Sequence, residues 1–243
     1  MLSRIYAWLN RSPLGPVLSA LPVPLRFRDG RVRIVPFAAW RLDRVWRSHP
    51  SFEQESRAVY EAYDGGDVID VGAFEGWYSV LLAPKLETST MVSCEPDPGA
   101  YAELKTTLAM LDRVFKRPTF VPLPVAVGDG DPVSISHPEG GHPQFARAAG
   151  GEIPAPTIDQ LVDALGLRPG FVKVDVEGAE PFVLRGMQDT LQTHRPVVML
   201  EVHPKWLPSD MTVAEVESML ADQGYKPQPI STDELATRTL WLP

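Results

Sequence analysis

The chain has 243 residues, a formal net charge of −8 and 44% hydrophobic residues, which is typical of one α/β domain with a full core. The negative charge argues against non-specific binding to nucleic acid, because phosphate binding needs a basic surface. The single cysteine excludes an intrachain disulfide, and no stretch approaches the ~18 apolar residues that a membrane-spanning helix needs. We therefore expect a cytoplasmic protein with no nucleic-acid partner.

The N-terminal region differs in pattern from the rest of the chain. Residues 1–50 are predicted to form an appendage, and residues 51–243 the main domain. Within the appendage, polar and apolar residues alternate around Asp29-Gly30, which predicts a hairpin. Apolar residues at helical spacing between 52 and 63 predict the first helix of the main domain.

The next segment is the most informative one. An apolar run at 68–72 predicts a buried strand that ends in a glycine turn. Gly72 and Gly76 are expected to bring backbone N–H groups close to a ligand. A second strand, 91–95, ends in Glu95, and an acid at this tip can accept both hydroxyls of a ribose. The G-x-x-x-G spacing lacks the middle glycine of the dinucleotide fingerprint and fits a nucleoside without pyrophosphate, such as S-adenosylmethionine.

The rest of the chain keeps alternating strands with helices. Strand 119–127 contains Pro122 and Pro124, which favours the edge of a sheet ordered 3-2-1-4-5. Residues 128–156 are rich in Gly and Pro and predict an insertion loop or hairpin that covers the substrate. The remaining predicted elements are helices beginning near 76, 97, 157, 181 and 212, and strands at 171–175, 197–202, 225–230 and 239–242. The predicted fold is a doubly wound, mostly parallel Rossmann-like sheet.

Acidic residues at neighbouring strand tips point to a cofactor site. Asp70 and Glu95 are costly there without a ligand, so Asp70 is expected to orient the turn or bind the cofactor ammonium. Glu75 lies within the turn and either contacts the amino-acid end of the cofactor or faces solvent. Trp77 opens the following helix and either packs in the core or contacts the cofactor.

A second group of residues points to the chemistry. Asp175, at the tip of the fourth strand, is assigned to the site, Glu177 is left open, and Glu180 is assigned to helix capping or packing. Carboxylates of this kind also bind divalent cations, but the sequence offers no further support for a metal. His203 directly follows the fifth strand and is the candidate base, with an unperturbed pKa of about 6.5, and Asp175 is its competitor.

Together these motifs resemble the FkbM-type family of S-adenosylmethionine-dependent methyltransferases. The resemblance rests on the motifs at 68–73, 95–98, 126–129, 157–159, 173–180 and 200–204. It implies methyl transfer to a hydroxyl oxygen, often on a sugar or natural product. Glu75 stands where the family usually has Asn, which puts that cofactor contact in doubt.

The resemblance also implies roles for individual residues. Gly72 and Gly76 would line the methionine side with Asp70, while Ala126 and Val127 would flank the adenine. The whole predicted cofactor set is Asp70, Gly72, Ala73, Glu75, Gly76, Trp77, Glu95, Pro96, Ala126 and Val127, and the catalytic set is His203, Asp175 and Glu177.

The sequence thus predicts an S-adenosylmethionine-dependent O-methyltransferase that acts on a small-molecule or glycoside acceptor. Two alternatives stay open at this point. A nucleotide-dependent oxidoreductase is disfavoured by the missing glycine, and a non-catalytic Rossmann-like interaction module is left open by Glu75.

Overall fold

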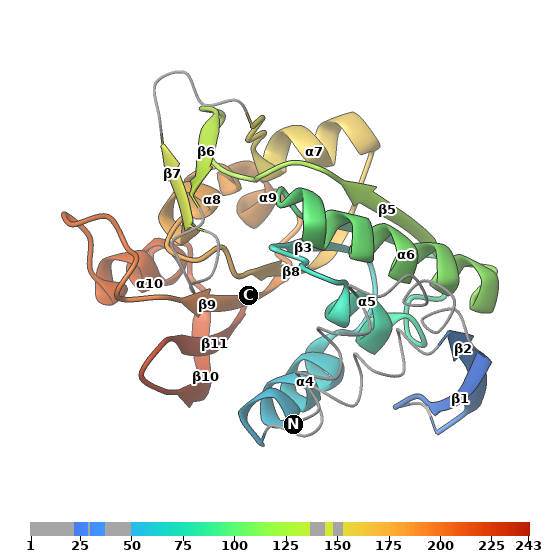
Figure 1. Ribbon diagram of the computed structural model, residues 1–243. Coiled ribbons are helices and arrows are strands. Elements are labelled where there is room, and N and C mark those ends of the chain that lie inside the picture. Colours follow the sequence, from blue (N-terminus) through green and yellow to red (C-terminus); the bar gives the residue numbers. More distant parts are fainter. Residues whose placement is uncertain (1–21, 29, 37–49, 137–143, 148–152) are drawn as a thin grey trace.

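A seven-stranded sheet forms the centre of the protein (Figure 1). The computed structural model describes residues 22–28, 30–36, 50–136, 144–147 and 153–243. In spatial order the strands are β10 (Lys226–Thr232), β11 (Thr237–Leu242), β9 (Val197–Val202), β8 (Pro169–Val174), β3 (Asp67–Val71), β4 (Thr90–Cys94) and β5 (Thr119–Leu123).

The order of the strands confirms the doubly wound arrangement. From β9 to β5 all neighbours are parallel, while β11 is antiparallel to both β9 and β10. The third strand of the main domain, β5, lies at the edge as its prolines predict. It ends at Leu123, so it is shorter than the predicted strand 119–127.

Helices cover both faces of the sheet (Figure 1). The first face carries α4 (Pro50–Ala62), α5 (Trp77–Leu82) and α6 (Pro98–Val114), and the second carries α7 (Ile158–Leu165), α8 (Glu180–Arg185), α9 (Gln188–Thr193) and α10 (Val213–Ala221). Since side chains alternate along a strand, Val68 packs into the core of the first face and Ile69 into that of the second. Asp70 therefore points to the first face, although it lies within an apolar strand.

Two hairpins lie outside the central sheet. β1 (Pro22–Arg26) pairs antiparallel with β2 (Val32–Pro36) at the position of the predicted N-terminal hairpin. Phe27 packs edge-on against Phe115 with ring centroids 5.4 Å apart, so the hairpin joins the core of the first face. Its separation from the main domain at residue 50 stays a prediction.

The second hairpin, β6 (Val133–Ser136) with β7 (Gln144–Arg147), lies within the predicted insertion 128–156. Its role as a cover for the substrate stays a prediction, and residues 137–143 and 148–152 of the insertion lie outside the described residues.

Local signals set the helix ends as the sequence predicts. Asp97 caps α6 by accepting from the Ala100 N–H, and capping boxes open α7 and α10. Among the described residues no helix is both long and apolar enough to cross a bilayer.

Candidate active site

A cavity of about 300 Å³ opens at the carboxyl ends of the parallel strands. Its walls come from the segments that follow β3, β4, β5, β8 and β9, with a contribution from β11. This is the edge at which doubly wound sheets bind their ligands.

The glycine turn after β3 is packed tightly between its neighbours. Gly72 has a φ of +78°, and a Cβ there would lie 1.8 Å from the Asp175 carbonyl oxygen, so only glycine fits. The N–H groups of Gly72 and Ala73 both donate to the Cys94 carbonyl, at 3.1 and 3.0 Å. These two hydrogen bonds join β3 to β4, and the expectation that the glycine turn brings backbone N–H groups close to a ligand stays a prediction.

Gly76 also serves packing. Its φ is +90°, and a Cβ there would lie 2.9 Å from Leu104 Cδ1 on α6. Its N–H donates to Ala73 O, so it closes the turn and starts α5.

Glu95 is held in a fixed orientation at the cavity wall. Its Oε2 accepts from the Phe74 N–H and its Oε1 from the Asp97 N–H, both at 2.8 Å. Burial raises the pKa of Glu95, and these two hydrogen bonds oppose the rise. The carboxylate is 6% exposed and each oxygen keeps a lone pair for a further donor.

Half of the predicted cofactor residues line the cavity. These are Gly72, Glu95, Pro96, Ala126 and Val127. The other half, which do not line it, are Asp70, Ala73, Glu75, Gly76 and Trp77.

Trp77 is the clearest difference from the predicted set. Its indole is buried in the core of the first face and donates to Ser56 Oγ at 3.2 Å, which agrees with the core alternative. Sequence reasoning missed Phe74, which is 53% exposed, lines the cavity and has a φ of +48°. Its position inside the glycine turn is the sequence feature that could have identified it as a cavity residue.

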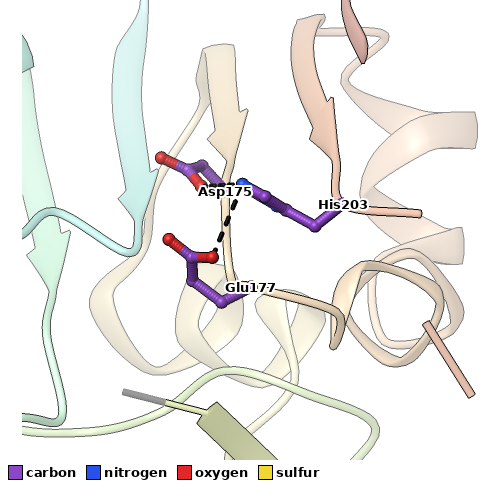
Figure 2. A group of neighbouring side chains, drawn as sticks. All are labelled: Asp175, Glu177 and His203. Carbon is purple, nitrogen blue, oxygen red and sulfur yellow. Dashed lines mark ion pairs between the residues drawn. The ribbon is translucent and has the colours of Figure 1, made fainter. Parts of the chain in front are cut away.

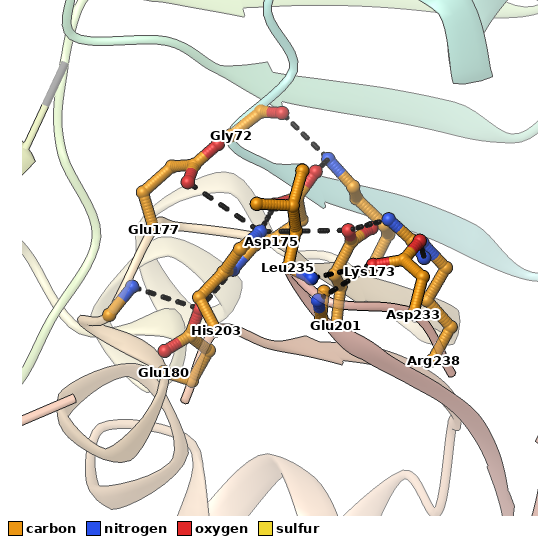
Figure 3. A network of polar contacts seen from close by, with 12 residues as sticks. Gly72, Lys173, Asp175, Glu177, Glu180, Glu201, His203, Asp233, Leu235 and Arg238 are labelled. Carbon is orange, nitrogen blue, oxygen red and sulfur yellow. Dashed lines mark hydrogen bonds and ion pairs between the residues drawn. The ribbon is translucent and has the colours of Figure 1, made fainter. Parts of the chain in front are cut away.

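Polar side chains from five neighbouring strands form a row on the first face of the sheet, and Figure 3 shows three of them, Lys173, Glu201 and Arg238. The strand register places Asp70 beside both Ser93 and Lys173, and Glu201 beside Arg238. All five side chains are buried. The sequence contains the signal, since each strand carries one polar residue at a position that faces the first side.

Lys173 connects this row to the glycine turn. Its Nζ lies 3.5 Å from Asp70 Oδ1 and 3.1 Å from Asp175 Oδ2, and it donates to Gly72 O at 2.6 Å. Asp70 itself is fully buried and does not line the cavity. Its link to the turn therefore runs through Lys173.

Arg238 closes the row at β11. Its guanidinium contacts Glu201 at 2.6 Å, Asp233 at 2.7 Å and Glu55 at 3.1 Å. Burial raises the pKa values of both Glu55 and Glu201, and the Arg238 charge opposes this. Sequence reasoning missed Arg238 and Glu55, because they lie far apart in the chain and only the sheet order brings them together.

His203 lies at the centre of an acidic cluster (Figure 2). Its Nδ1 is 3.0 Å from Glu180 Oε1, which also accepts from the Gly178 N–H. Its Nε2 faces Glu177 Oε2 at 3.5 Å, Glu201 Oε1 at 3.6 Å and Asp175 Oδ1 at 3.9 Å. Glu180, the first residue of α8, thus satisfies the Gly178 N–H and orients the imidazole.

The cluster changes the acid–base character of its members. Burial lowers the pKa of His203, but the hydrogen bond with Glu180 and the charges of Asp175 and Glu177 outweigh it and raise the pKa to about 9. The imidazole is then a cation at neutral pH, so the expected base with an unperturbed pKa does not fit this environment. Burial raises the pKa of Glu177 to about 7.

Residues 70–227 match the family model of the methyltransferase FkbM domain, which is more than half of the chain. The chain belongs to the FkbM methyltransferase family. It is 27% identical over 198 residues to the hexuronic acid methyltransferase AglP of Haloferax volcanii, over 78% of this chain and 79% of that protein.

Two solved structures support the Rossmann-like fold. Methyltransferase FkbM from Methylobacillus flagellatus KT matches with a TM-score of 0.51 and 19% identity, over 73% of this chain and 43% of that one. The chain therefore spans less than half of that protein. The Methanococcus jannaschii fibrillarin pre-rRNA processing protein matches with a TM-score of 0.52 and 11% identity, over 91% of this chain and 82% of that one.

The FkbM-family match includes every predicted site residue, from Asp70 to His203, but ends before Asp233 and Arg238. Arg238, which contacts Glu201, and Asp233, which contacts Arg238, thus come from outside the matched region.

Proposed function

We propose that this FkbM-family protein transfers the methyl group of S-adenosylmethionine to a hydroxyl oxygen of a sugar or natural-product-like small molecule. The observation that carries the proposal is the Glu95 carboxylate, which two backbone N–H groups hold at the cavity wall. An acid in this position of a doubly wound sheet suits the two hydroxyls of a ribose.

The walls around Glu95 suit the rest of the cofactor. Ala126 and Val127 offer apolar contact to an adenine ring on one side, and Phe74 adds an exposed aromatic ring. The methionine end would then lie towards Gly72, and the methyl group towards the acidic cluster.

The acceptor side of the proposal rests on the cluster of Asp175, Glu177 and His203, all of which line the same cavity. The carboxylate and imidazole groups there can orient an acceptor hydroxyl for in-line attack, and a carboxylate can receive its proton. The relative AglP is named as a hexuronic acid methyltransferase, which supports a sugar-class acceptor for this chain. Membership of a methyltransferase family speaks against the oxidoreductase alternative.

The test starts with calorimetry of the purified protein with S-adenosylmethionine and, separately, with NAD. We expect binding of S-adenosylmethionine that Glu95→Ala weakens, and no change in Asp163→Asn, which removes an exposed carboxylate on α7. Methyl transfer from labelled S-adenosylmethionine is then screened over glycosides, uronic acids and polyketide-like alcohols. Binding of NAD alone would support the oxidoreductase, and binding of neither ligand would support an interaction module.

A further inference from the structure

We propose that Asp175, Glu177 and His203 form a binding site for a divalent transition-metal ion at the acceptor end of the cavity. Each of them offers one ligand atom, and these atoms all lie within 4.8 Å of one another (Figure 2). The role of the ion in catalysis rests on the proposed function, whereas its binding can be measured independently.

The spacing of the groups suits a shared ion better than direct hydrogen bonds. His203 Nε2 lies 3.5 Å from Glu177 Oε2 and 3.9 Å from Asp175 Oδ1. An ordinary N–H···O bond spans about 2.7–3.2 Å. Two ligands that each lie about 2.1 Å from one ion are about 3.0–4.2 Å apart. The side chains of Glu177 and Asp175 are 22% and 24% exposed, so a small rotation can close the widest gap.

The imidazole is oriented as a metal ligand, which is an observation independent of the acidic residues. Fully buried Glu180 holds Nδ1 at 3.0 Å, which favours a proton on Nδ1, so a metal ion can displace the proton from Nε2 and bind the nitrogen that faces the cluster. His203 is only 4% exposed, and its Nε2 makes no hydrogen bond with any described residue. A carboxylate behind the second ring nitrogen is the usual support of a metal-binding histidine.

Asp175 and Glu177 each also have a carboxylate oxygen that can bind a metal ion. Lys173 lies 3.1 Å from Asp175 Oδ2, while Oδ1 faces the imidazole. Glu177 Oε2 is buried and has no hydrogen-bond partner among the described residues. Glu201 also faces Nε2, but its Oε1 is bound to Arg238 at 2.6 Å, which makes it a supporting group instead of a ligand.

Charge favours a cation at this point. Among the described residues, four carboxyl groups lie within 4 Å of the imidazole nitrogens: Asp175, Glu177, Glu180 and Glu201. The neighbouring cations are already shared, Lys173 with Asp70 and Arg238 with Glu55 and Asp233. Buried carboxylates in excess of their counter-ions are stabilised by an added cation.

The donor set indicates the class of ion. One imidazole and two carboxylates suit Mn²⁺, Fe²⁺ or Zn²⁺ better than Mg²⁺ or Ca²⁺, which prefer oxygen ligands alone. Three protein ligands leave positions for an acceptor hydroxyl, and coordination would lower the pKa of that hydroxyl. In this arrangement the ion would activate the acceptor hydroxyl, and the His203 imidazole would serve as a ligand.

The experiment uses untagged, EDTA-treated protein and Mn²⁺ as the probe, followed by electron paramagnetic resonance and calorimetry without S-adenosylmethionine. We expect one Mn²⁺ per chain in the wild type and at least tenfold weaker binding in Asp175→Asn and in Glu177→Gln. Both positions are partly exposed, so the variants should fold, which circular dichroism checks. Asp163→Asn on α7 is the charge-matched control and should bind Mn²⁺ as the wild type does.

The metal proposal is overturned if the wild type takes up no Mn²⁺ at 1 mM, on the order of the weakest biological divalent sites. It is also overturned if both variants bind Mn²⁺ like the wild type. Calorimetry with S-adenosylmethionine on the same samples separates the two proposals. Cofactor binding and methyl transfer by metal-free protein would support the proposed function and show that it does not need the ion. Mn²⁺ binding without cofactor binding would support the metal site and contradict the proposed function.

Discussion

The acidic residues on the two walls of the cavity differ in the contacts that their carboxylate oxygens make. On the β3–β4 side, both oxygens of Glu95 accept backbone N–H groups at 2.8 Å. On the β8–β9 side, Glu177, Glu201 and Asp175 face His203 Nε2 at 3.5–3.9 Å. On the β3–β4 side, the satisfied wall, the oxygens of Glu95 already accept hydrogen bonds from the chain and suit recognition of neutral hydroxyls. On the β8–β9 side, the charged wall, several carboxylates lie close together and suit a cation and a reacting group.

This difference sets what each wall should do when it is altered. A change on the satisfied wall should weaken cofactor binding and little else. A change on the charged wall should affect turnover and metal binding while leaving the cofactor in place. The following predictions test this division, from the largest expected effect to the smallest.

The largest effect is expected from the charged wall. Asp175→Asn and His203→Gln should each lower the turnover of methyl transfer by roughly 10²–10⁴-fold, because both lie where the acceptor hydroxyl must be oriented and deprotonated. Affinity for S-adenosylmethionine should stay within about twofold of the wild type, measured by calorimetry. A large loss of cofactor affinity in both variants would show that the walls are not separate.

The junction of the two walls is Gly72. Gly72→Ala should lower the free energy of unfolding by about 3–5 kcal/mol, since the added Cβ would lie 1.8 Å from the Asp175 carbonyl at a φ of +78°. Gly166 is the matched control, with a φ of +63° and no atom within 4 Å of its Cβ position. Gly166→Ala should cost only about 1–2 kcal/mol in urea denaturation. Equal losses in the two variants would remove the packing argument.

On the satisfied wall, Glu95→Ala should weaken S-adenosylmethionine binding by about 1.5–3 kcal/mol, the range for a charge-assisted hydrogen bond. The uptake of Mn²⁺ should not change, because Glu95 makes no contact with the His203 cluster in any described interaction. Calorimetry with each ligand measures both quantities on one sample, and unchanged cofactor affinity would reassign the ribose site.

A smaller effect is expected for Glu180, which contacts Nδ1 of the His203 imidazole. Glu180→Gln should weaken Mn²⁺ binding by about tenfold, the lower end for an outer-shell group. An amide oxygen can still accept from Nδ1 and from the Gly178 N–H, which both use Oε1, so mainly the charge is lost. S-adenosylmethionine affinity should be unchanged. A variant that binds Mn²⁺ at full strength would show that Glu180 serves packing alone.

The fold could be predicted from the sequence because its signals are local. Apolar runs, capping boxes and prolines determine each element, and the prolines of β5 even place that strand at the edge. Glu95 was singled out in the same way, since it ends an apolar strand, and its position at the cavity wall agrees with the proposed cofactor role. The residue at the end of a strand can be identified from the sequence of that strand alone.

Each strand shows its single polar residue in the sequence, but which of these residues meet could not be predicted, because that depends on the sheet order. Glu55 and Arg238 are 183 positions apart and meet only because α4 packs on the face where β11 presents its guanidinium. The raised pKa of His203 arises in the same way, because His203 follows β9 while the groups that raise it, Glu180, Asp175 and Glu177, follow β8. The hydrogen bonds of the Gly72 and Ala73 N–H groups to Cys94 O could not be predicted either, because the contact with β4 is also non-local.

The smallest effect on the site is expected for Trp77, which tests where the cofactor wall ends. Trp77→Phe removes the hydrogen bond to Ser56 Oγ and part of the ring from a buried position, so unfolding should become easier by about 1–3 kcal/mol. Ser56→Ala removes the same hydrogen bond alone and should cost about 1 kcal/mol. Neither change should alter S-adenosylmethionine affinity by more than about twofold, because the indole lies in the core of the first face and does not line the cavity. A tenfold loss of affinity in Trp77→Phe, with normal affinity in Ser56→Ala, would extend the cofactor wall to the start of α5.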